Sequence, residues 1–286
     1  MAKETFEITD EIGIVRVDKH LANIFPEYSR SALAKLFLLN LIKLKGEPIE
    51  PGYKLRPGAV IEYDLGPLQE KPEVIPLPII YEDENVLVVD KPAGIISHAR
   101  GKFWQEASVA SFIRDRISGM SGERGGIVHR LDRATSGVMI CAKNEESLKF
   151  LQKQFHDRKV QKTYVAIIDR EPKEPVAIID APIGRNPKDP KTFYVTKEGK
   201  NAETRYEITD QLDKKFVVNL SPKTGRTHQL RVHMSYINCP IIGDHLYGGT
   251  DNDRLLLHAH TLELELPDGN RKVFTADLPA EFNIKS

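Results

Sequence analysis

Two apolar runs flank a short charged segment in the stretch Gly126-Ile127-Val128-His129-Arg130-Leu131-Asp132-Arg133-Ala134-Thr135-Ser136-Gly137-Val138-Met139-Ile140-Cys141. The second run continues to Ala142 and is almost wholly apolar, which is typical of a strand covered on both faces. Ser136 and Gly137 mark the start of this strand. Asp132 is therefore predicted to lie in a tight turn at a strand end, and loops held by buried strands often carry catalytic groups.

Two other interpretations of the charged segment were weighed. Taken alone, it is equally compatible with a solvated turn, because Asp is a common turn former. The order His129-Arg130-Leu131-Asp132 also resembles the His-Arg-Asp of protein kinases. A leucine intervenes here, however, and the chain has neither the glycine-rich loop upstream nor the Asp-Phe-Gly downstream. The kinase interpretation is therefore rejected.

Length and charge limit the classes of protein that fit. The chain has 286 residues, enough for one large domain or two unequal ones, and 41 basic residues balance 41 acidic ones. A net charge of zero argues against a protein that binds polyanions over its whole surface. The segment 214–233 nevertheless contains basic residues and no acidic one (Lys214, Lys215, Lys223, Arg226, Arg231). Such a segment suits phosphate groups, although a chance solvated face would look the same.

Neither a metal site nor a membrane span is indicated. Cys141 and Cys239 lack the spacing of metal or redox sites, and His228 and His233 are predicted on different helix faces. The apolar segment 33–44 is too short to span a membrane and contains two lysines. Charged residues at positions 3, 4 and 7 interrupt any apolar leader. We therefore expect a cytoplasmic protein that binds no metal and no membrane.

Residues 14–65 are predicted to form a small αβ module. Ser29 is suited to cap a helix whose apolar residues repeat at helical spacing (Leu33, Leu36, Phe37, Leu41). A hairpin is expected over 42–49 and a strand over 60–63. Glycine and prolines then alternate with charged residues over 66–78, which is typical of a semi-rigid linker. We place the boundary near 66–77, with domains of residues 1–70 and 71–286.

The larger domain is predicted to be a mixed α+β fold, because strands occur in unequal groups with scattered helices. Strands are expected over 138–142, 161–168, 204–209, 216–220, 255–266 and 272–276. One helix is expected over 107–117 and another after Asn144, which can cap it. A third is expected over 227–237, with His228, Arg231 and Ser235 on one face.

Ordered motifs across residues 79–282 resemble the RluA-type pseudouridine synthase family. The motif that carries this resemblance is His129-Arg130-Leu131-Asp132 followed by Thr135-Ser136-Gly137. The others are Tyr81-Glu82-Asp83-Glu84, Asp90-Lys91-Pro92-Ala93-Gly94, Lys162-Thr163-Tyr164, Pro182-Ile183-Gly184-Arg185, the run 224–233, Ile242-Gly243-Asp244 and Leu257-His258-Ala259. The first module is similar to the S-four-type RNA-binding domain that this family often carries. The resemblance implies a catalytic domain with a mixed, largely antiparallel sheet.

The resemblance also implies an activity. Specific uridines in RNA would be converted to pseudouridine: the base is detached at N1, turned, and rejoined to the ribose through carbon five. No metal or organic cofactor is implied, and the expected partner is RNA, with large-subunit ribosomal RNA favoured over transfer RNA. A monomer is expected. The alternatives are a non-catalytic RNA-binding or ribosome-assembly protein on the same fold, and a glycosidase, which would need a second carboxylate that no matched motif supplies.

Three residues are expected to carry the chemistry. Asp132 is the catalytic carboxylate, and whether it adds to the sugar, adds to the ring or acts as a base is left open. Burial alone would raise its pKa, so a cation must keep it ionised, and the resemblance points to Arg231 in a planar, bidentate pair. Tyr164 would pack on the target base, where a core aromatic is the default alternative.

Other residues are expected to hold the RNA. Arg130 would occupy the position vacated by the extracted base, and a simple phosphate contact is almost as good an explanation. Leu257 would line the base pocket, unless it is an ordinary core residue. Four basic residues would meet phosphates, which fix position without reading sequence (Arg226, Lys223, Arg30, Lys43).

Overall fold

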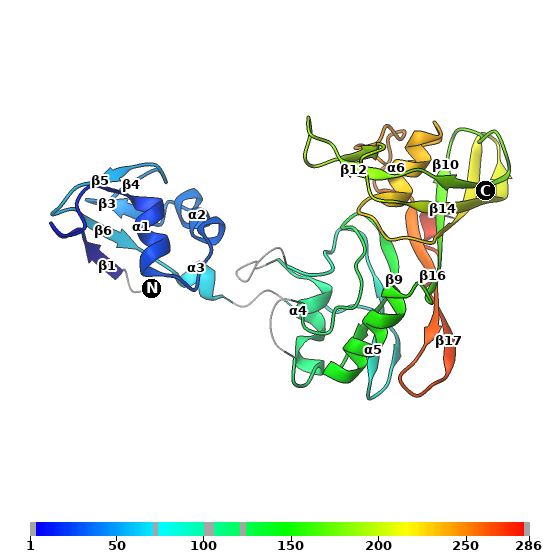
Figure 1. The fold of residues 1–286 in the computed structure, drawn as a ribbon, viewed down its shortest axis with the longest axis horizontal. Helices are drawn as coiled ribbons and strands as arrows, with labels where there is room; N and C mark the ends of the chain where they lie inside the picture. The colour runs from blue at the N-terminus through cyan, green and yellow to red at the C-terminus, as the bar shows by residue number, and fades with distance from the viewer. Residues whose placement is uncertain (1–3, 71–73, 100–105, 121–123, 283–286) are drawn as a thin grey trace. The chain divides into compact units, whose positions relative to one another are not determined.

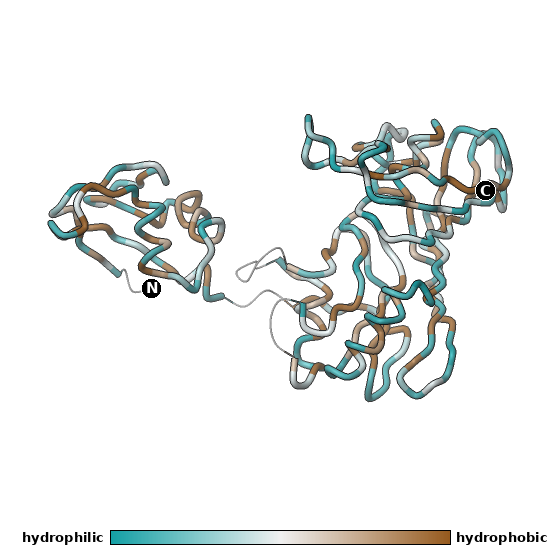
Figure 2. The backbone as a smooth tube through the Cα atoms, viewed as in Figure 1, coloured by the Kyte–Doolittle hydropathy of each residue, from teal (hydrophilic) through white to brown (hydrophobic). Residues whose placement is uncertain are grey.

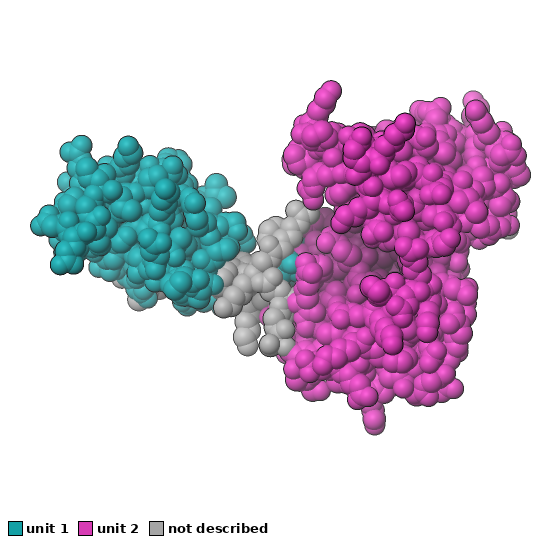
Figure 3. Space-filling model, viewed as in Figure 1, with its two compact units in different colours: residues 1–74, 99–107 teal, residues 75–98, 108–286 magenta. Residues whose placement is uncertain are grey.

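The computed structural model describes residues 4–70, 74–99, 106–120 and 124–282. The chain divides into two compact units, one of residues 1–74 with 99–107 and one of residues 75–98 with 108–286 (Figure 3). The division after Val74 lies inside the segment predicted as a linker, of which 71–73 are outside the described residues. The first part of that segment is not a linker: Gly66–Gln69 form helix α3, because Leu65 and Leu68 are buried in the core of unit 1.

Besides α3, the described part of unit 1 contains two longer helices, a four-stranded sheet and a two-stranded one. Its further elements are β1 Glu4–Glu7, β2 Val15–Arg16, α1 Val17–Ile24, α2 Arg30–Leu38, β3 Ile42–Leu44, β4 Glu47–Pro48, β5 Lys54–Leu55 and β6 Val60–Tyr63. The order β1-β6-β3-β4 forms an antiparallel sheet, and β2 pairs with β5. The Ser29 hydroxyl accepts a hydrogen bond from the Ala32 amide at 3.2 Å, which confirms the predicted cap of α2.

Unit 2 is organised around a nine-stranded sheet in the order β11-β14-β15-β10-β16-β9-β8-β7, with β17 paired to β16 (Figure 1). Its strands are β7 Ile79–Glu82, β8 Val86–Lys91, β9 Ser136–Ala142, β10 Gln161–Ile168, β11 Val176–Asp180, β14 Glu203–Leu212, β15 Lys215–Pro222, β16 Leu257–Glu265 and β17 Arg271–Thr275. A separate hairpin joins β12 Ile183–Arg185 to β13 Phe193–Val195. Only β9 and β16 pair in parallel within this sheet, which confirms the expected mixed, largely antiparallel fold.

The helices of unit 2 agree with the sequence where a local cap defines them. In α5, Glu145–His156, the Asn144 side chain accepts from the Ser147 amide at 2.9 Å, as predicted. The expected helix over 107–117 is shorter: α4 spans Val109–Ile113, and Arg114–Arg116 continue as a 3₁₀ turn. Helix α6, Gln229–Tyr236, begins two residues later than predicted because His228 has a left-handed backbone with φ of 57°. A further 3₁₀ turn covers Ala280–Phe282.

Two large hydrophobic cores and a small cluster of Ile183, Ala202 and Val232 lie within the described part of unit 2, and β16 passes from one large core to the other. Leu257 packs in the core formed with β10, β14, β15 and α6, whereas Ala259, Leu262 and Leu264 pack in the core formed with β8, β9 and α5. Tyr164 on β10 contacts both cores. The outer loops are largely hydrophilic, and the hydrophobic residues gather along the strands and helices (Figure 2). The junction between the cores therefore falls at the positions of Tyr164 and Leu257.

Gly137 permits the close approach of β9 and β16 at this junction. Ser136 and Gly137 lie opposite His258 and Ala259 in the parallel pairing. A Cβ atom on Gly137 would lie 2.2 Å from the Ala259 carbonyl oxygen, and its φ of 116° is one that other residues rarely adopt. This close pairing of β9 and β16 brings the motifs Thr135-Ser136-Gly137 and Leu257-His258-Ala259 side by side. It also places the Asp132 turn beside β10 and β16.

Candidate active site

Hydrogen bonds at Leu131 and Arg133, the residues on either side of Asp132, fix the turn that carries it. The Leu131 amide donates to the Ser97 hydroxyl at 3.0 Å, and that hydroxyl donates back to the Leu131 carbonyl at 2.8 Å. The Arg133 carbonyl accepts from the Gly94 amide at 2.8 Å and from Lys91 Nζ at 3.4 Å. Because the residues on either side are fixed in this way, Asp132 has little backbone freedom.

Lys91 is fully buried beneath the turn. Its ammonium donates to the carbonyls of Pro92 at 2.9 Å and Ile95 at 2.7 Å, in addition to that of Arg133. Burial lowers the pKa of Lys91 to about 7, and the negative charge of Asp132 opposes this shift. The Asp90-Lys91-Pro92-Ala93-Gly94 motif therefore supports the turn from below.

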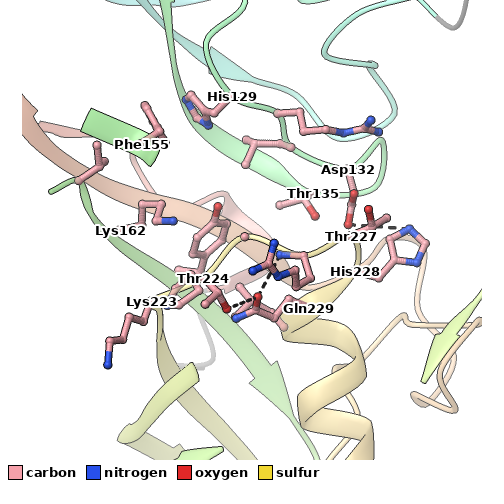
Figure 4. Close-up of a pocket in the computed structure, with 18 of the residues that line it drawn as sticks. His129, Asp132, Thr135, Phe155, Lys162, Lys223, Thr224, Thr227, His228 and Gln229 are labelled. Atoms are coloured by element: carbon pink, nitrogen blue, oxygen red, sulfur yellow. Dashed lines mark hydrogen bonds and ion pairs between the residues drawn. The ribbon is translucent and has the colours of Figure 1, made fainter. Parts of the chain in front are cut away.

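Asp132 faces a cleft with a volume of about 600 Å³ (Figure 4). The cleft is bounded by the 129–135 turn, the end of α5, strands β10 and β16, the loop after β15 and the start of α6. The residues from the sequence predictions that line it are Arg130, Asp132, Tyr164, Lys223, Arg226, Arg231 and Leu257. Side chains from five separate segments of the chain thus line the cleft that Asp132 faces.

Tyr164 reaches the cleft from an irregular point of the sheet. The register between β10 and β16 shifts between Thr163 and Tyr164, and such irregularities re-aim side chains beside active sites. Burial raises the pKa of Tyr164, and the charge of Asp132 raises it further. The hydroxyl therefore keeps its proton at neutral pH and is available as a hydrogen-bond donor.

Arg231 is buried, but its bidentate partner is Asp244 and not Asp132. Arg231 Nε donates to Asp244 Oδ2 at 2.8 Å and Nη2 donates to Oδ1 at 2.6 Å. Burial opposes the charge of this guanidinium, whereas Asp244 and then Asp132 favour it, and the pKa of Arg231 is raised. The predicted planar pair with Asp132 is therefore wrong in its partner, because the Ile242-Gly243-Asp244 turn brings a closer carboxylate to the guanidinium. Arg231 still acts on Asp132 through its charge.

His228 is the site residue that the sequence analysis missed. Its Nε2 lies 3.9 Å from Asp132 Oδ2, and the two side chains point toward each other across the cleft (Figure 4). The sequence indicated only that His228 lies on a polar helix face and that its spacing from His233 does not suit a metal site. Its position directly after the turn 224–227 and three residues before Arg231 was the available signal. The left-handed backbone that aims it at Asp132 could not be read from periodicity.

Gln229 organises the loop that forms the opposite wall. Its Oε1 accepts from the Thr224 hydroxyl at 2.7 Å and from the Arg226 amide at 3.0 Å. Its Nε2 donates to the Glu203 carbonyl and the Thr204 hydroxyl, both at 3.0 Å. The loop 223–227 is thereby fixed to the start of β14.

The part of the cleft lined by His129 and Phe155 also contains the half-buried amine of Lys162. His129 stacks on Phe155 with ring centroids 4.7 Å apart, and its Nε2 accepts from the Ile140 amide at 3.1 Å. Burial, and then the charge of Lys162, lower the pKa of His129 to about 3, so this ring is neutral and structural. Burial also lowers the pKa of Lys162, which lines the cleft and was predicted only as part of a motif.

Comparison with known proteins identifies the family. Residues 85–236 match the model of the RNA pseudouridylate synthase family, and this range contains Asp132, Tyr164 and Arg231. The chain belongs to this family. A ribosomal large subunit pseudouridine synthase D of Borreliella burgdorferi is 37% identical over 97% of this chain and 90% of its own length. An uncharacterized RNA pseudouridine synthase of Aquifex aeolicus is 42% identical over 86% of this chain and 80% of its own length.

A solved structure supports the same assignment. The human RNA pseudouridylate synthase domain containing 1 superposes with a TM-score of 0.59 at 28% identity, covering 73% of this chain and 86% of the human chain. The protein is an RNA pseudouridine synthase of the RluA type, and therefore an isomerase that acts on RNA. The alternative of a non-catalytic binding protein on the same fold is set aside.

The other residues predicted to contact RNA differ in their exposure and in their hydrogen-bond partners. Arg130 is exposed at the edge of the cleft, and Leu257 is buried in its wall. Arg226 Nε donates to the Asn201 carbonyl at 3.0 Å, and Lys223 forms an exposed ion pair with Glu203 at 3.0 Å.

Arg30 and Lys43 belong to unit 1 of the synthase and do not line the cleft. The Arg30 guanidinium pairs with Asp18 at 2.5 Å on the surface of unit 1, and Lys43 lies opposite Glu62 in the β3–β6 pairing.

Within residues 4–70, 74–99, 106–120 and 124–282, no group of three or more His, Cys, Asp or Glu side chains is arranged to hold a metal ion. In the same described part of the synthase, no helix combines the length and apolar character needed to cross a membrane.

Proposed function

We propose that this synthase converts uridines of large-subunit ribosomal RNA to pseudouridine, with Asp132 as the catalytic carboxylate. The observation that carries the proposal is the convergence of Tyr164, His228 and Leu257 around the Asp132 side chain in one cleft. The choice of RNA rests on the 37% identical relative that is named for the large ribosomal subunit.

The reaction begins with a uridine turned out of the RNA into the cleft. Tyr164 packs against the base, and stacking of a base on an aromatic ring contributes about 1–3 kcal/mol. The bond between N1 and the ribose C1′ breaks, the uracil turns, and a new bond joins C5 to C1′. The proton on C5 leaves, N1 gains a proton, and the composition of the RNA is unchanged. Asp132 assists either as the nucleophile or as the base, and the Tyr164 hydroxyl takes part in moving the C5 proton.

The Arg231–Asp244 pair supplies a fixed charge beside this chemistry. Because the guanidinium is held by two hydrogen bonds, it cannot swing away when RNA enters. Its positive charge and the negative charge of the Asp132 carboxylate attract each other within the cleft. Arg130 fills the position that the turned-out base leaves, and Leu257 closes the pocket around the uracil. Arg226 and Lys223 contact phosphates along the edge of the cleft.

Release of tritium from RNA labelled at uridine C5 tests the proposed substrate. The purified synthase is expected to release tritium from large-subunit ribosomal RNA at least about 10-fold faster than from bulk transfer RNA, a difference of ~1.4 kcal/mol in transition-state binding. Equal rates on both RNAs would contradict the proposed choice of RNA without affecting the chemistry. Mapping pseudouridines in cells with and without the synthase identifies the modified positions.

We propose in addition that unit 1 is an S-four-type RNA-binding domain in which Arg30 and Lys43 contact phosphates. The supporting observations are its two helices packed on a small antiparallel sheet and the exposed position of Arg30. Each neutralised phosphate contributes to the salt dependence of binding, because condensed counterions are released.

Affinity falls as salt concentration rises, so the slope of log affinity against log salt concentration is negative. The double substitution Arg30→Gln with Lys43→Gln is expected to make this slope less steep by about 1.5 to 2. The rate of tritium release at saturating RNA is expected to stay the same, since neither residue lines the cleft. A matched control replaces the exposed Lys173 and Lys188 of unit 2 by glutamine and should leave the slope unchanged. An unaltered slope in the double variant would refute the phosphate contacts.

A further inference from the structure

A chain of hydrogen bonds behind Asp132 determines which nitrogen of His228 carries its proton. The Phe193 amide donates to the Tyr247 hydroxyl oxygen at 3.0 Å, and that oxygen lies 2.7 Å from His228 Nδ1. The Tyr247 oxygen already accepts from that amide, and His228 Nδ1 is the other hydrogen-bond partner of the hydroxyl among the described residues, so we assign the hydroxyl hydrogen as donated to Nδ1. The neutral imidazole then carries its proton on Nε2, the nitrogen that faces Asp132 Oδ2 at 3.9 Å.

Two aromatic rings and an unusual backbone conformation fix the position of the His228 ring. His228 packs edge-on against the rings of Phe193 and Tyr247, with centroids 5.6 Å from each. Its left-handed backbone is unusual for a residue other than glycine, and such conformations cluster at functional sites. The guanidinium of Arg231 lies 5.0 Å from the Tyr247 ring centroid, so the tyrosine is fixed from a second direction.

Charged and titratable groups surround His228 on each side. The groups that act on it are Asp132, Arg231, Asp244, Arg130 and the Tyr247 hydroxyl. Burial lowers the pKa of His228, Asp132 opposes this shift, and Arg231 reinforces it, so the net direction is down. Burial likewise raises the pKa of Tyr247, which keeps its hydrogen in place. At neutral pH the ring is therefore uncharged.

We propose that His228 is a positioning residue that orients the Asp132 carboxylate through its Nε2–H, in a tautomer set by Tyr247, and that protonation of the ring inactivates the synthase. The distance of 3.9 Å shortens to a hydrogen bond by a movement of about 1 Å when RNA fills the cleft, as is common for catalytic contacts. One carboxylate oxygen is then fixed and the other remains available to the uridine. When the imidazole gains a second proton, it forms an ion pair with Asp132 that withdraws the carboxylate from the reaction.

The left-handed backbone decides which substitutions are informative. Asparagine tolerates this conformation, but its amide reaches only the Nδ1 position and leaves Asp132 without a donor. Glutamine is longer, and its amide nitrogen reaches the Nε2 position, so it restores the donor without being able to titrate. The pair His228→Asn and His228→Gln therefore separates the hydrogen bond to Asp132 from the mere filling of space.

The experiment measures single-turnover tritium release and RNA affinity against pH for the full chain. His228→Asn is expected to lose about 10²-fold in rate at saturating RNA, as for a displaced catalytic group, with unchanged RNA affinity. His228→Gln is expected to recover to within about 10-fold of the unmodified synthase. Its activity should also persist to a lower pH than that of the unmodified synthase, because glutamine cannot gain the proton that inactivates the histidine. The exposed His245, which does not line the cleft, provides the control His245→Gln with an unaltered profile.

A second readout does not depend on activity. Nitrogen-15 spectra of the histidine side chains are expected to show His228 protonated on Nε2. Asp132→Asn should lower the pKa of His228, with about a tenfold larger acid ionisation constant, because the opposing negative charge is lost. A proton on Nδ1, or an ionisation constant that does not respond to Asp132→Asn, would overturn the proposal. So would equal losses in the asparagine and glutamine variants with an unchanged pH profile, which would indicate a structural role alone.

This inference rests on the proposed role of Asp132, and the two can fail separately. Tritium release by Asp132→Asn would remove the proposed role of the carboxylate itself. Loss of release in Asp132→Asn, combined with wild-type rates and pH profile in His228→Asn, would remove only the role of His228.

Discussion

Replacing Asp132 by asparagine is expected to reduce tritium release from uridine C5 by more than about 10⁴-fold, as for the loss of a central catalytic group. Asparagine has nearly the same shape, and the Ser97, Gly94 and Lys91 contacts to the neighbouring residues do not involve the Asp132 side chain. The turn therefore persists, and only the charge and its nucleophilic oxygen are lost. RNA affinity should be unchanged or slightly higher, because a negative charge is removed near phosphates.

The control for this substitution is Asp251→Asn, which changes the charge equally at a side chain that is 97% exposed. It should retain full activity. Single-turnover kinetics at saturating RNA and filter binding at fixed salt separate chemistry from affinity. Release by Asp132→Asn within 10-fold of the unmodified rate would contradict the catalytic role.

The loss of Asp244 is expected to have the largest effect on stability. Asp244→Ala removes both hydrogen bonds to the Arg231 guanidinium, which is buried and has no second bidentate partner among the described residues. An uncompensated buried charge typically costs about 3–5 kcal/mol. The free energy of unfolding of unit 2, measured in urea, should fall by that amount. Tritium release should also fall, because Arg231 no longer has a fixed position.

An exposed ion pair gives the comparison. Arg271 Nε lies 2.6 Å from Glu263 Oε1, and Glu263→Gln at this partly exposed site should cost less than about 1 kcal/mol. Two variants separate charge from shape at the buried pair. Asp244→Asn keeps one hydrogen bond and should lie between the wild type and Asp244→Ala. Equal stabilities of Asp244→Ala and the wild type would show that Arg231 reaches another anion.

Features defined by neighbouring residues were predictable from the sequence. The Ser29 and Asn144 caps form as expected because the donor amides lie three residues further along the chain. The strand after Gly137 is buried along its whole length, as its continuous apolar run indicates. The Asp132 turn follows from this strand. The place of Tyr164 and Leu257 in the same cleft was implied by the family resemblance and not by neighbouring residues.

Features that depend on contacts between residues far apart in the chain were not predictable from the sequence. The partner of Arg231 is thirteen residues away in a turn whose path no periodicity specifies. The start of α6 depends on one left-handed residue, His228, whose ring is held by Tyr247 and Phe193 from other segments. The Gln229 contacts to Glu203 and Thr204 likewise cross 26 and 25 residues of sequence. A helix pattern records which face is polar, but not which side chain turns out of the helix to meet a carboxylate.

The passage of β16 between two cores has a consequence for how the cleft responds to strain. Leu257 belongs to one core and Ala259 to the other, and only His258 separates them, with its Nδ1 2.8 Å from the Ser136 hydroxyl. A change in the twist of β16 therefore moves the elements around one core relative to those around the other, with His258 at the pivot. We therefore expect the width of the cleft beside Asp132 to depend on the twist of the sheet. Core substitutions far along the strand, at Leu262 or Leu264, would alter the pocket without touching RNA.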